Sequence, residues 1–168
     1  MIDNFIRILN NFTEFQALKI FFISMAPITE LRLSIPYGIL NTEIDWYIVV
    51  ILSIIGNIFV GCIVLYLLPH IIIVITKINI FNKIYDFIIK RTKNRSKIIE
   101  QRKYYGLIIF VSIPLPFSGV WTGALASNLL GLSRKKSILA ICIGVLISSF
   151  FVTLLVIIFE ISFGFNKH

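Results

Sequence analysis

Glu30 and Arg32 are the two charged residues of this 168-residue chain whose positions most need an explanation. They lie in the stretch TELRLSIPYGIL, residues 29–40, between segments apolar enough to lie in a lipid bilayer. Translocon-based scales give a cost of about 2.5–3.5 kcal/mol for each such charge at the bilayer centre. At positions i and i+2 of a regular α-helix the two side chains would point to opposite sides. On a chain broken between Pro27 and Pro36 they could instead converge on one cavity.

Two interpretations of this charged pair are open. In the functional one, Arg32 is a fixed cation for an anionic group and Glu30 is a protonatable group, with Pro36 and Tyr37 in the same site. In the structural one, the segment reaches only the headgroup layer and both charged side chains extend to water. We favour the functional interpretation because both residues follow an apolar half-helix that is expected to end near the midplane.

A second stretch, PLPFSGVWTGALAS at residues 114–127, has the composition of an uncharged partner for the first. Its prolines break a helix, its glycines allow close backbone approach, and its hydroxyl groups and indole N–H offer hydrogen bonds. Free N–H groups at a helix N-terminus after the second proline favour an anion. Small residues are equally typical of helix packing in membranes, so both roles remain open. The candidate residues are Pro114, Pro116, Ser118, Gly119, Trp121, Thr122 and Gly123.

The other reactive residue types give no support for enzymology of the soluble kind. The sequence has no glycine-rich phosphate loop, no cluster of His and Cys, and no Ser/His/Asp set. Cys62 and Cys142 both lie in apolar runs, where small packing residues are the ordinary interpretation. We therefore expect no catalytic residue, no metal site and no cofactor.

The elements that position the candidate residues are membrane helices. Hydrophobic residues make up 58% of the chain and charged residues 14%, which is the composition of an integral membrane protein. Trp46–Leu68 and Ser137–Phe159 carry no charge, and each gives about 34 Å of helix, enough to cross a bilayer. Ala17–Ala26 and Tyr104–Ile113 give only about 15 Å each before a proline. These two stretches predict half-helices.

Each half-helix is followed by a polar or glycine-rich tip and a second apolar piece, which predicts a re-entrant helical hairpin. The predicted fold is an all-α integral membrane protein with two inverted repeats, each a re-entrant hairpin followed by a transmembrane helix, and with amphipathic interfacial helices. It forms one membrane domain over residues 1–168. Its parts are an interfacial helix at 1–16, a first repeat at 17–76, a basic cytoplasmic connector at 77–103 and a second repeat at 104–168.

Lysine and arginine residues orient these elements, because cytoplasmic loops carry the excess of basic residues. The connector and the turn LSRKKS before the last span are basic and should face the cytoplasm, whereas NTEID before the first span is acidic and suits the outside. These placements agree only if the two hairpins enter the membrane from opposite sides. Inverted repeats with broken helices are the usual construction of secondary transporters, with the site near the midplane.

Together the two tips resemble the paired motifs of the small multidrug export family of prokaryotic membrane proteins. The first motif matches at Glu30, Arg32, Ile35, Pro36 and Gly38, and the second at Pro114, Leu115, Pro116, Gly119, Trp121, Thr122 and Gly123. Where that family has a Gly–Thr–Gly core, this chain has Phe117, Ser118 and Gly119, which keeps a hydroxyl group but loses one glycine. The layout is also similar to that of the DedA/VTT superfamily. That resemblance implies translocation of lipids or lipid carriers such as undecaprenyl phosphate.

Three functions remain open at this point. We expect a multi-pass transport protein of the prokaryotic plasma membrane, not an enzyme, that moves a small or amphipathic substrate through a site between the hairpins, with protons as the candidate coupling ion. The alternatives are a DedA-like flippase for an anionic lipid phosphate and, from another class, a non-transporting membrane scaffold. The expected partners are membrane lipids, the substrate, protons and a second copy of the chain in a homodimer, whereas nucleic acid is not expected.

Overall fold

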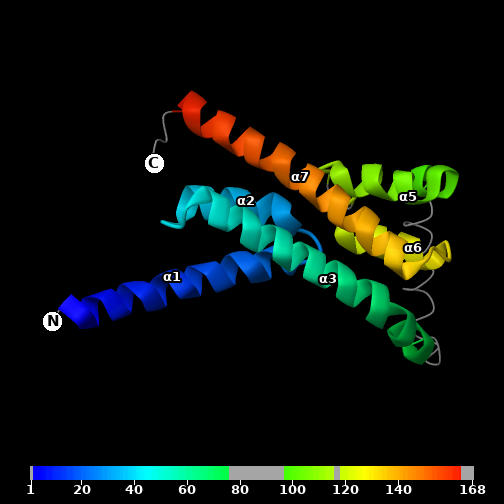
Figure 1. The fold of residues 1–168 in the computed structure, drawn as a ribbon, viewed down its shortest axis with the longest axis horizontal. Helices are drawn as coiled ribbons and strands as arrows, with labels where there is room; N and C mark the ends of the chain where they lie inside the picture. Colours follow the sequence, from blue (N-terminus) through cyan, green and yellow to red (C-terminus); the bar gives the residue numbers. More distant parts are fainter. Residues whose placement is uncertain (1, 76–96, 116–117, 164–168) are drawn as a thin grey trace. The chain divides into compact units, whose positions relative to one another are not determined.

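The computed structural model describes residues 2–75, 97–115 and 118–163, and the side-chain surroundings of residues 14–67, 102–115 and 118–162. Within these ranges the chain is helical and has no strand (Figure 1). The helices are α1 (Ile2–Met25), α2 (Glu30–Asn41), α3 (Trp46–Ile75), α5 (Lys97–Ser112), α6 (Val120–Leu129) and α7 (Arg134–Phe163). The all-α prediction is thus confirmed for the described residues, while most of the predicted connector at 77–103 lies outside them.

Two compact units divide the described chain, and each contains part of both long helices. The first unit comprises residues 1–57 and 149–168, and therefore holds α1, α2, the start of α3 and the end of α7. The second comprises residues 58–148, and holds the rest of α3, α5, α6 and the start of α7. Each unit is described by itself below.

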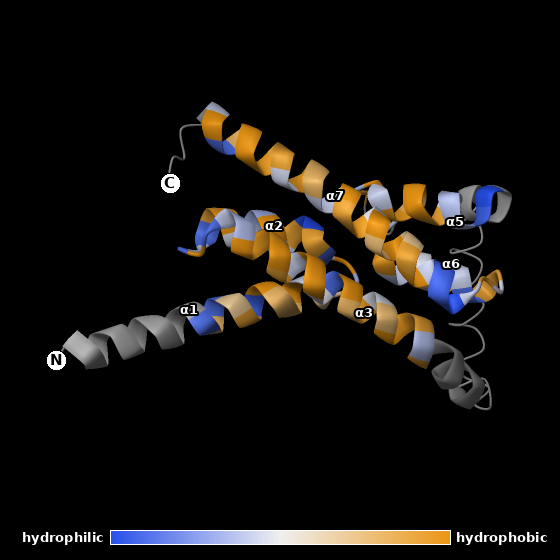
Figure 2. Cartoon of the chain, viewed as in Figure 1, coloured by the Kyte–Doolittle hydropathy of each residue, from blue (hydrophilic) through white to orange (hydrophobic). Residues whose placement is uncertain are grey.

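Helices α3 and α7 are the two predicted spans. Their segments Trp46–Leu67 and Arg134–Ser162 are long and apolar enough to cross a membrane, and both helices are hydrophobic over most of their length (Figure 2). On α3 the side chains of Ile48, Ile51, Ile55 and Phe59 are exposed at helical spacing. A helix of a soluble protein would bury such a stripe, so an apolar solvent is the natural surrounding of this face.

The predicted half-helices end where the sequence places prolines. Helix α1 ends at Met25, two residues before Pro27, and α5 ends at Ser112, two residues before Pro114. A proline disfavours helical geometry at the preceding residue, which explains both ends. Inside α5 the backbone of Lys103 is non-helical, with φ 49° and ψ −116°, so its second part begins at Tyr104 as predicted.

Helix α1 continues without a break from Ile2 to Met25, through the predicted interfacial segment 1–16 and into the predicted first repeat. The physical reason is that this stretch contains neither proline nor glycine, so nothing interrupts the hydrogen-bonded ladder before Pro27. Whether the first part of α1 lies at a membrane surface stays a prediction.

The break between α1 and α2 is shorter than predicted. It occupies residues 26–29, and α2 begins at Glu30, so Glu30 and Arg32 lie in a helical turn instead of an irregular tip. The Thr29 hydroxyl donates to the Ile23 carbonyl at 2.9 Å, and the Glu30 amide donates to the Ala26 carbonyl at 3.1 Å. These bonds satisfy backbone groups at the break, and they let the next helix begin within one turn.

In the second unit, the end of α6 lies beside Tyr104, where the second part of α5 begins. The amide of Leu132 donates to the Ser127 carbonyl at 3.0 Å and that of Gly131 to the Asn128 carbonyl at 3.1 Å, which is a Schellman motif. Gly131 has φ 64°, the left-handed conformation that this motif requires. The Tyr104 hydroxyl then accepts a hydrogen bond from the Ser133 amide at 3.1 Å. The chain therefore enters α5 at Tyr104 and leaves α6 at one end of a helical hairpin.

Basic and aromatic side chains gather at that same end. The Arg134 guanidinium lies 5.3 Å from the ring centre of Tyr66, and the Lys136 ammonium lies 5.7 Å from that of Tyr104. Tyrosines with lysines and arginines are typical of a membrane–water interface. This end of the second unit is where the sequence predicts a cytoplasmic surface.

A mid-span glycine packs in the same way in both units. A Cβ placed on Gly56 of α3 would meet the Ser24 hydroxyl and lie 2.8 Å from the Phe21 carbonyl oxygen. A Cβ on Gly144 of α7 would lie 2.7 Å from Val111 Cβ and 3.1 Å from the Ile108 carbonyl oxygen. In each unit the two contacted residues stand three and six positions before the proline that ends the half-helix. The two halves of the sequence thus share a packing register.

Candidate functional site

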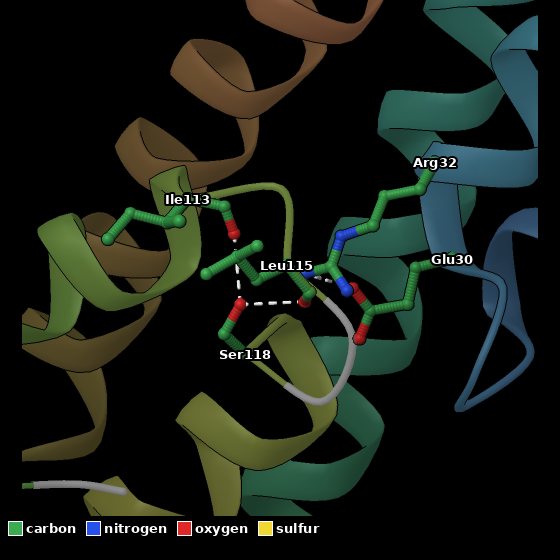
Figure 3. Close-up of polar contacts among 5 residues, drawn as sticks. All are labelled: Glu30, Arg32, Ile113, Leu115 and Ser118. Atoms are coloured by element: carbon green, nitrogen blue, oxygen red, sulfur yellow. Dashed lines mark hydrogen bonds and ion pairs between the residues drawn. The ribbon is translucent and has the colours of Figure 1, made fainter.

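The charged pair Glu30 and Arg32 is brought together at the start of α2. Arg32 Nη2 lies 3.7 Å from Glu30 Oε2, and the two side chains are 15% and 5% exposed, respectively (Figure 3). Glu30 has φ 47°, one of two positive values among the non-glycine residues described. This left-handed residue departs from regular helical spacing, so the i, i+2 side chains can meet although a straight helix would separate them.

The positive φ of Glu30 has a local cost in conformational free energy. For a residue with a Cβ, the left-handed conformation costs about 1–2 kcal/mol, and burying two charges adds a desolvation cost. Neither cost is needed to begin a helix, because uncharged residues begin helices without them. Strain of this kind gathers at functional sites, which makes this turn the strongest candidate in the described chain.

Arg32 has hydrogen-bonding capacity that its contact with Glu30 does not use. Its Nε is buried and has no hydrogen-bond partner among the described residues. The 3.7 Å approach to Glu30 is an ion contact longer than a hydrogen bond. A guanidinium carries five N–H donors in a planar fork, so Arg32 retains donors for a further acceptor.

The other two candidates of the first motif lie one turn further along α2. Pro36 stands inside the helix, and both Pro36 and Tyr37 are half-buried. Because proline has no N–H, the carbonyl of Arg32 receives no i+4 hydrogen bond from it. The Arg32 carbonyl oxygen therefore keeps hydrogen-bond acceptor capacity close to the charged pair.

The second motif uses its candidate residues to build the turn and pack the helices. Ser118 Oγ donates toward the carbonyl oxygens of Ile113 at 3.0 Å and Leu115 at 2.7 Å, which closes the turn after Pro114 (Figure 3). Gly119 is the N-cap of α6. A Cβ on Gly123 would lie 2.8 Å from Val111 Cγ2, so this glycine serves close packing of α6 on α5. Trp121 and Thr122 are half-buried on α6, and Pro116 lies outside the described residues.

The sequence interpretation missed two polar features of α3. Ser53 is fully buried, and it shares a 2.8 Å hydrogen bond with Ser34 of α2. Asn57, one turn further along, is also fully buried, and neither its amide nitrogen nor its carbonyl oxygen has a hydrogen-bond partner among the described residues. A lone amide side chain inside a long apolar run was the available signal for Asn57.

Among the residues that the structure describes, no group of three or more His, Cys, Asp or Glu side chains could hold a metal ion. The candidate site therefore consists of a carboxylate, a guanidinium and polar neighbours. Such a set can bind an ion or a charged group and can exchange a proton at Glu30.

Long exposed apolar helices, shorter helices that end beside prolines and a buried charge pair together define a helical membrane protein. A family model described as "Putative small multi-drug export protein" matches residues 30–151, and the chain belongs to this family. The match begins at Glu30 and covers α2, α6 and the glycine-bearing parts of α3 and α7. Comparisons with curated proteins and with solved structures found no match.

Proposed function

We propose that this protein is a multi-pass membrane transporter that moves a small or amphipathic substrate, with Glu30 and Arg32 as its binding and coupling residues. The observation that carries the proposal is the buried ion contact of 3.7 Å at the start of a helix. Charged residues inside membrane segments are rare and usually mark an ion or substrate pathway. Membership of a multi-drug export family favours a transported small molecule.

The two charges of the site have different roles in this proposal. Arg32 stays protonated at all relevant pH values, so it serves as the fixed cation. Glu30 can be charged or neutral. While Arg32 faces it, the carboxylate has a counter-ion. When a bound substrate becomes the partner of Arg32, the buried carboxylate loses this counter-ion and binds a proton. Substrate binding and proton uptake would then be linked at one site.

The matched glycine contacts of the two halves support the proposed transporter architecture. We infer two repeats of opposite orientation, each a re-entrant hairpin followed by a span. Helix α2 has 12 residues and α6 has 10, which gives about 18 Å and 15 Å of helix, or roughly half of a bilayer core. That the two hairpin tips face each other stays a prediction.

Cysteine labelling tests this topology. In a background in which Cys62 and Cys142 are replaced by alanine, we expect the exposed positions Glu14→Cys and Glu43→Cys to react from one side of the membrane and Ser133→Cys from the other. Labelling of Glu14→Cys and Glu43→Cys, which flank the first hairpin, from opposite sides would mean that this hairpin crosses the membrane, and it would contradict the inverted repeats. A reagent that cannot cross membranes, added to sealed vesicles of known orientation, makes the measurement.

Transport itself is tested with purified protein in lipid vesicles. We expect vesicles that contain the protein to move a cationic dye or a labelled polyprenyl phosphate faster than empty vesicles. Transport of the dye favours small-molecule export, whereas transport of the lipid phosphate alone favours the flippase alternative. Transport of neither probe by folded protein would count against both functions and in favour of the scaffold alternative.

A further inference from the structure

We propose that Asn57 is a third binding residue of the Glu30–Arg32 site, and that this site takes an oxyanion, the charged group of a carboxylate or a phosphate. The inference rests on the proposed function and adds a residue and a ligand class to it. It starts from the one buried amide of the described chain for which neither polar atom has a hydrogen-bond partner among the described residues.

The register of α2 against α3 places Asn57 beside the first turn of α2. The two helices run in opposite directions from the turn at residues 42–45, and two contacts fix their alignment. A Cβ on Gly38 would lie 3.0 Å from Val49 Cγ2, and Ser34 Oγ lies 2.8 Å from Ser53 Oγ. Each step is four residues back along α2 and four residues forward along α3. Continued by one more step, the same spacing brings Asn57 to the level of the first turn of α2, where Glu30 and Arg32 lie.

Burial agrees with this register. Glu30 is 3% exposed and Asn57 is 0% exposed, as are Ser34 and Ser53 one step nearer the turn. The buried side of the α2–α3 pair therefore has a polar line that ends at the charged pair. The hydroxyl groups of Ser34 and Ser53 are hydrogen-bonded to each other. Beside the charged pair, by contrast, Arg32 keeps an unused donor, and Asn57 keeps an unused donor and an unused acceptor.

The other half of the chain shows that packing does not need an amide at this position. Gly56 and Gly144 make matched contacts, and the residue that follows each of them is Asn57 in α3 and Val145 in α7. Val145 is also fully buried. An apolar side chain thus fills the equivalent place, and the amide of Asn57 must be explained by something other than the fold.

The unused groups of the site select the ligand class. Arg32 Nε and Asn57 Nδ2 are hydrogen-bond donors, and Asn57 Oδ1 is an acceptor. An oxyanion presents several acceptor oxygens, and arginine binds carboxylate and phosphate groups in bidentate geometries, one of which uses Nε. The acceptor Oδ1 suits an oxygen of the ligand that still carries a proton. A bare cation would leave both donors unused.

The experiment titrates purified full-length protein in detergent with inorganic phosphate and, separately, with phosphatidic acid held in the micelles. We expect wild-type protein to bind at least one probe, and Asn57→Val to bind it at least about tenfold more weakly, the loss of one hydrogen bond to a charged group. The thermal midpoint of Asn57→Val should be unchanged or raised, because an unsatisfied buried amide has been removed.

Asn128→Val is the matched control. The Asn128 amide donates to the Leu65 carbonyl at 3.4 Å and so has a structural role, and its loss should lower the thermal midpoint while probe binding is retained. Binding of phosphate supports a soluble oxyanion, and binding of phosphatidic acid alone supports a lipid headgroup. Wild-type binding of neither probe, or full binding by Asn57→Val, would overturn the inference. Neither result affects the proposed function, which is tested separately by transport in lipid vesicles.

Discussion

Replacement of Arg32 with alanine should lower the free energy of unfolding by about 3–5 kcal/mol, because it leaves the Glu30 carboxylate buried without its counter-ion. The Glu30 side chain is 5% exposed, so its carboxylate is poorly hydrated in the folded protein. Part of this cost disappears if Glu30 binds a proton, and the loss of stability should therefore be smaller in acid than at neutral pH. Denaturant titration in detergent micelles at both pH values makes the measurement.

Lys135→Ala is the control for the Arg32 prediction. It removes one positive charge from an exposed position in the first turn of α7, and we expect a change within about 0.5 kcal/mol. If Arg32→Ala were as stable as Lys135→Ala, the contact with Glu30 would be unimportant to the fold, and both charges would be better described as extending to water.

Valine at Gly144 or at Gly56 should destabilise the protein by about 1–3 kcal/mol or more, because a Cβ at either position meets a neighbouring helix. The nearest groups include the carbonyl oxygens of Ile108 and Phe21, which are backbone atoms and cannot move aside as a flexible side chain can. We expect the two substitutions to have similar effects, since the two contacts are equivalent in the two halves.

Ile143→Val and Ile55→Val are the matched controls for the glycine substitutions. Each stands next to one of the glycines and is about half exposed, so a lost methyl group should change stability little. Thermal unfolding of the four variants in the same detergent compares them directly. Tolerance of valine at one glycine but not at the other would contradict the shared packing register.

Much of the fold could be predicted from the sequence because the signals were physical ones. Uncharged runs predicted α3 and α7, and prolines predicted the ends of α1 and α5. The start of α2 was predicted less well. A proline on either side of Glu30 suggested an irregular tip, yet hydrogen bonds at Thr29 and Glu30 complete a helical turn there. Hydrogen bonds of this kind depend on the backbone conformation of the turn, which the hydropathy of its residues does not indicate.

The candidate site divides in the same way. Glu30 and Arg32 could be identified from the cost of charge in an apolar segment. Asn57 could not be connected with them, because that step needs the register of α2 against α3, which the Ser34–Ser53 contact supplies. For the second motif the sequence left packing and substrate lining open, and the described contacts of Ser118 and Gly123 are those of a turn and a packed helix.

The buried charge pair is proposed to bind the substrate and couple its transport. The most direct test is transport by the double variant Glu30→Gln/Arg32→Gln. Removing both charges together leaves no unpaired charge in the interior, so the protein should remain folded, with a thermal midpoint near that of wild type. The double variant and the wild-type protein are purified and reconstituted into separate lipid vesicles. The double variant is expected to lose transport of the probe that wild type moves. A folded double variant that transports this probe at the wild-type rate would contradict the account.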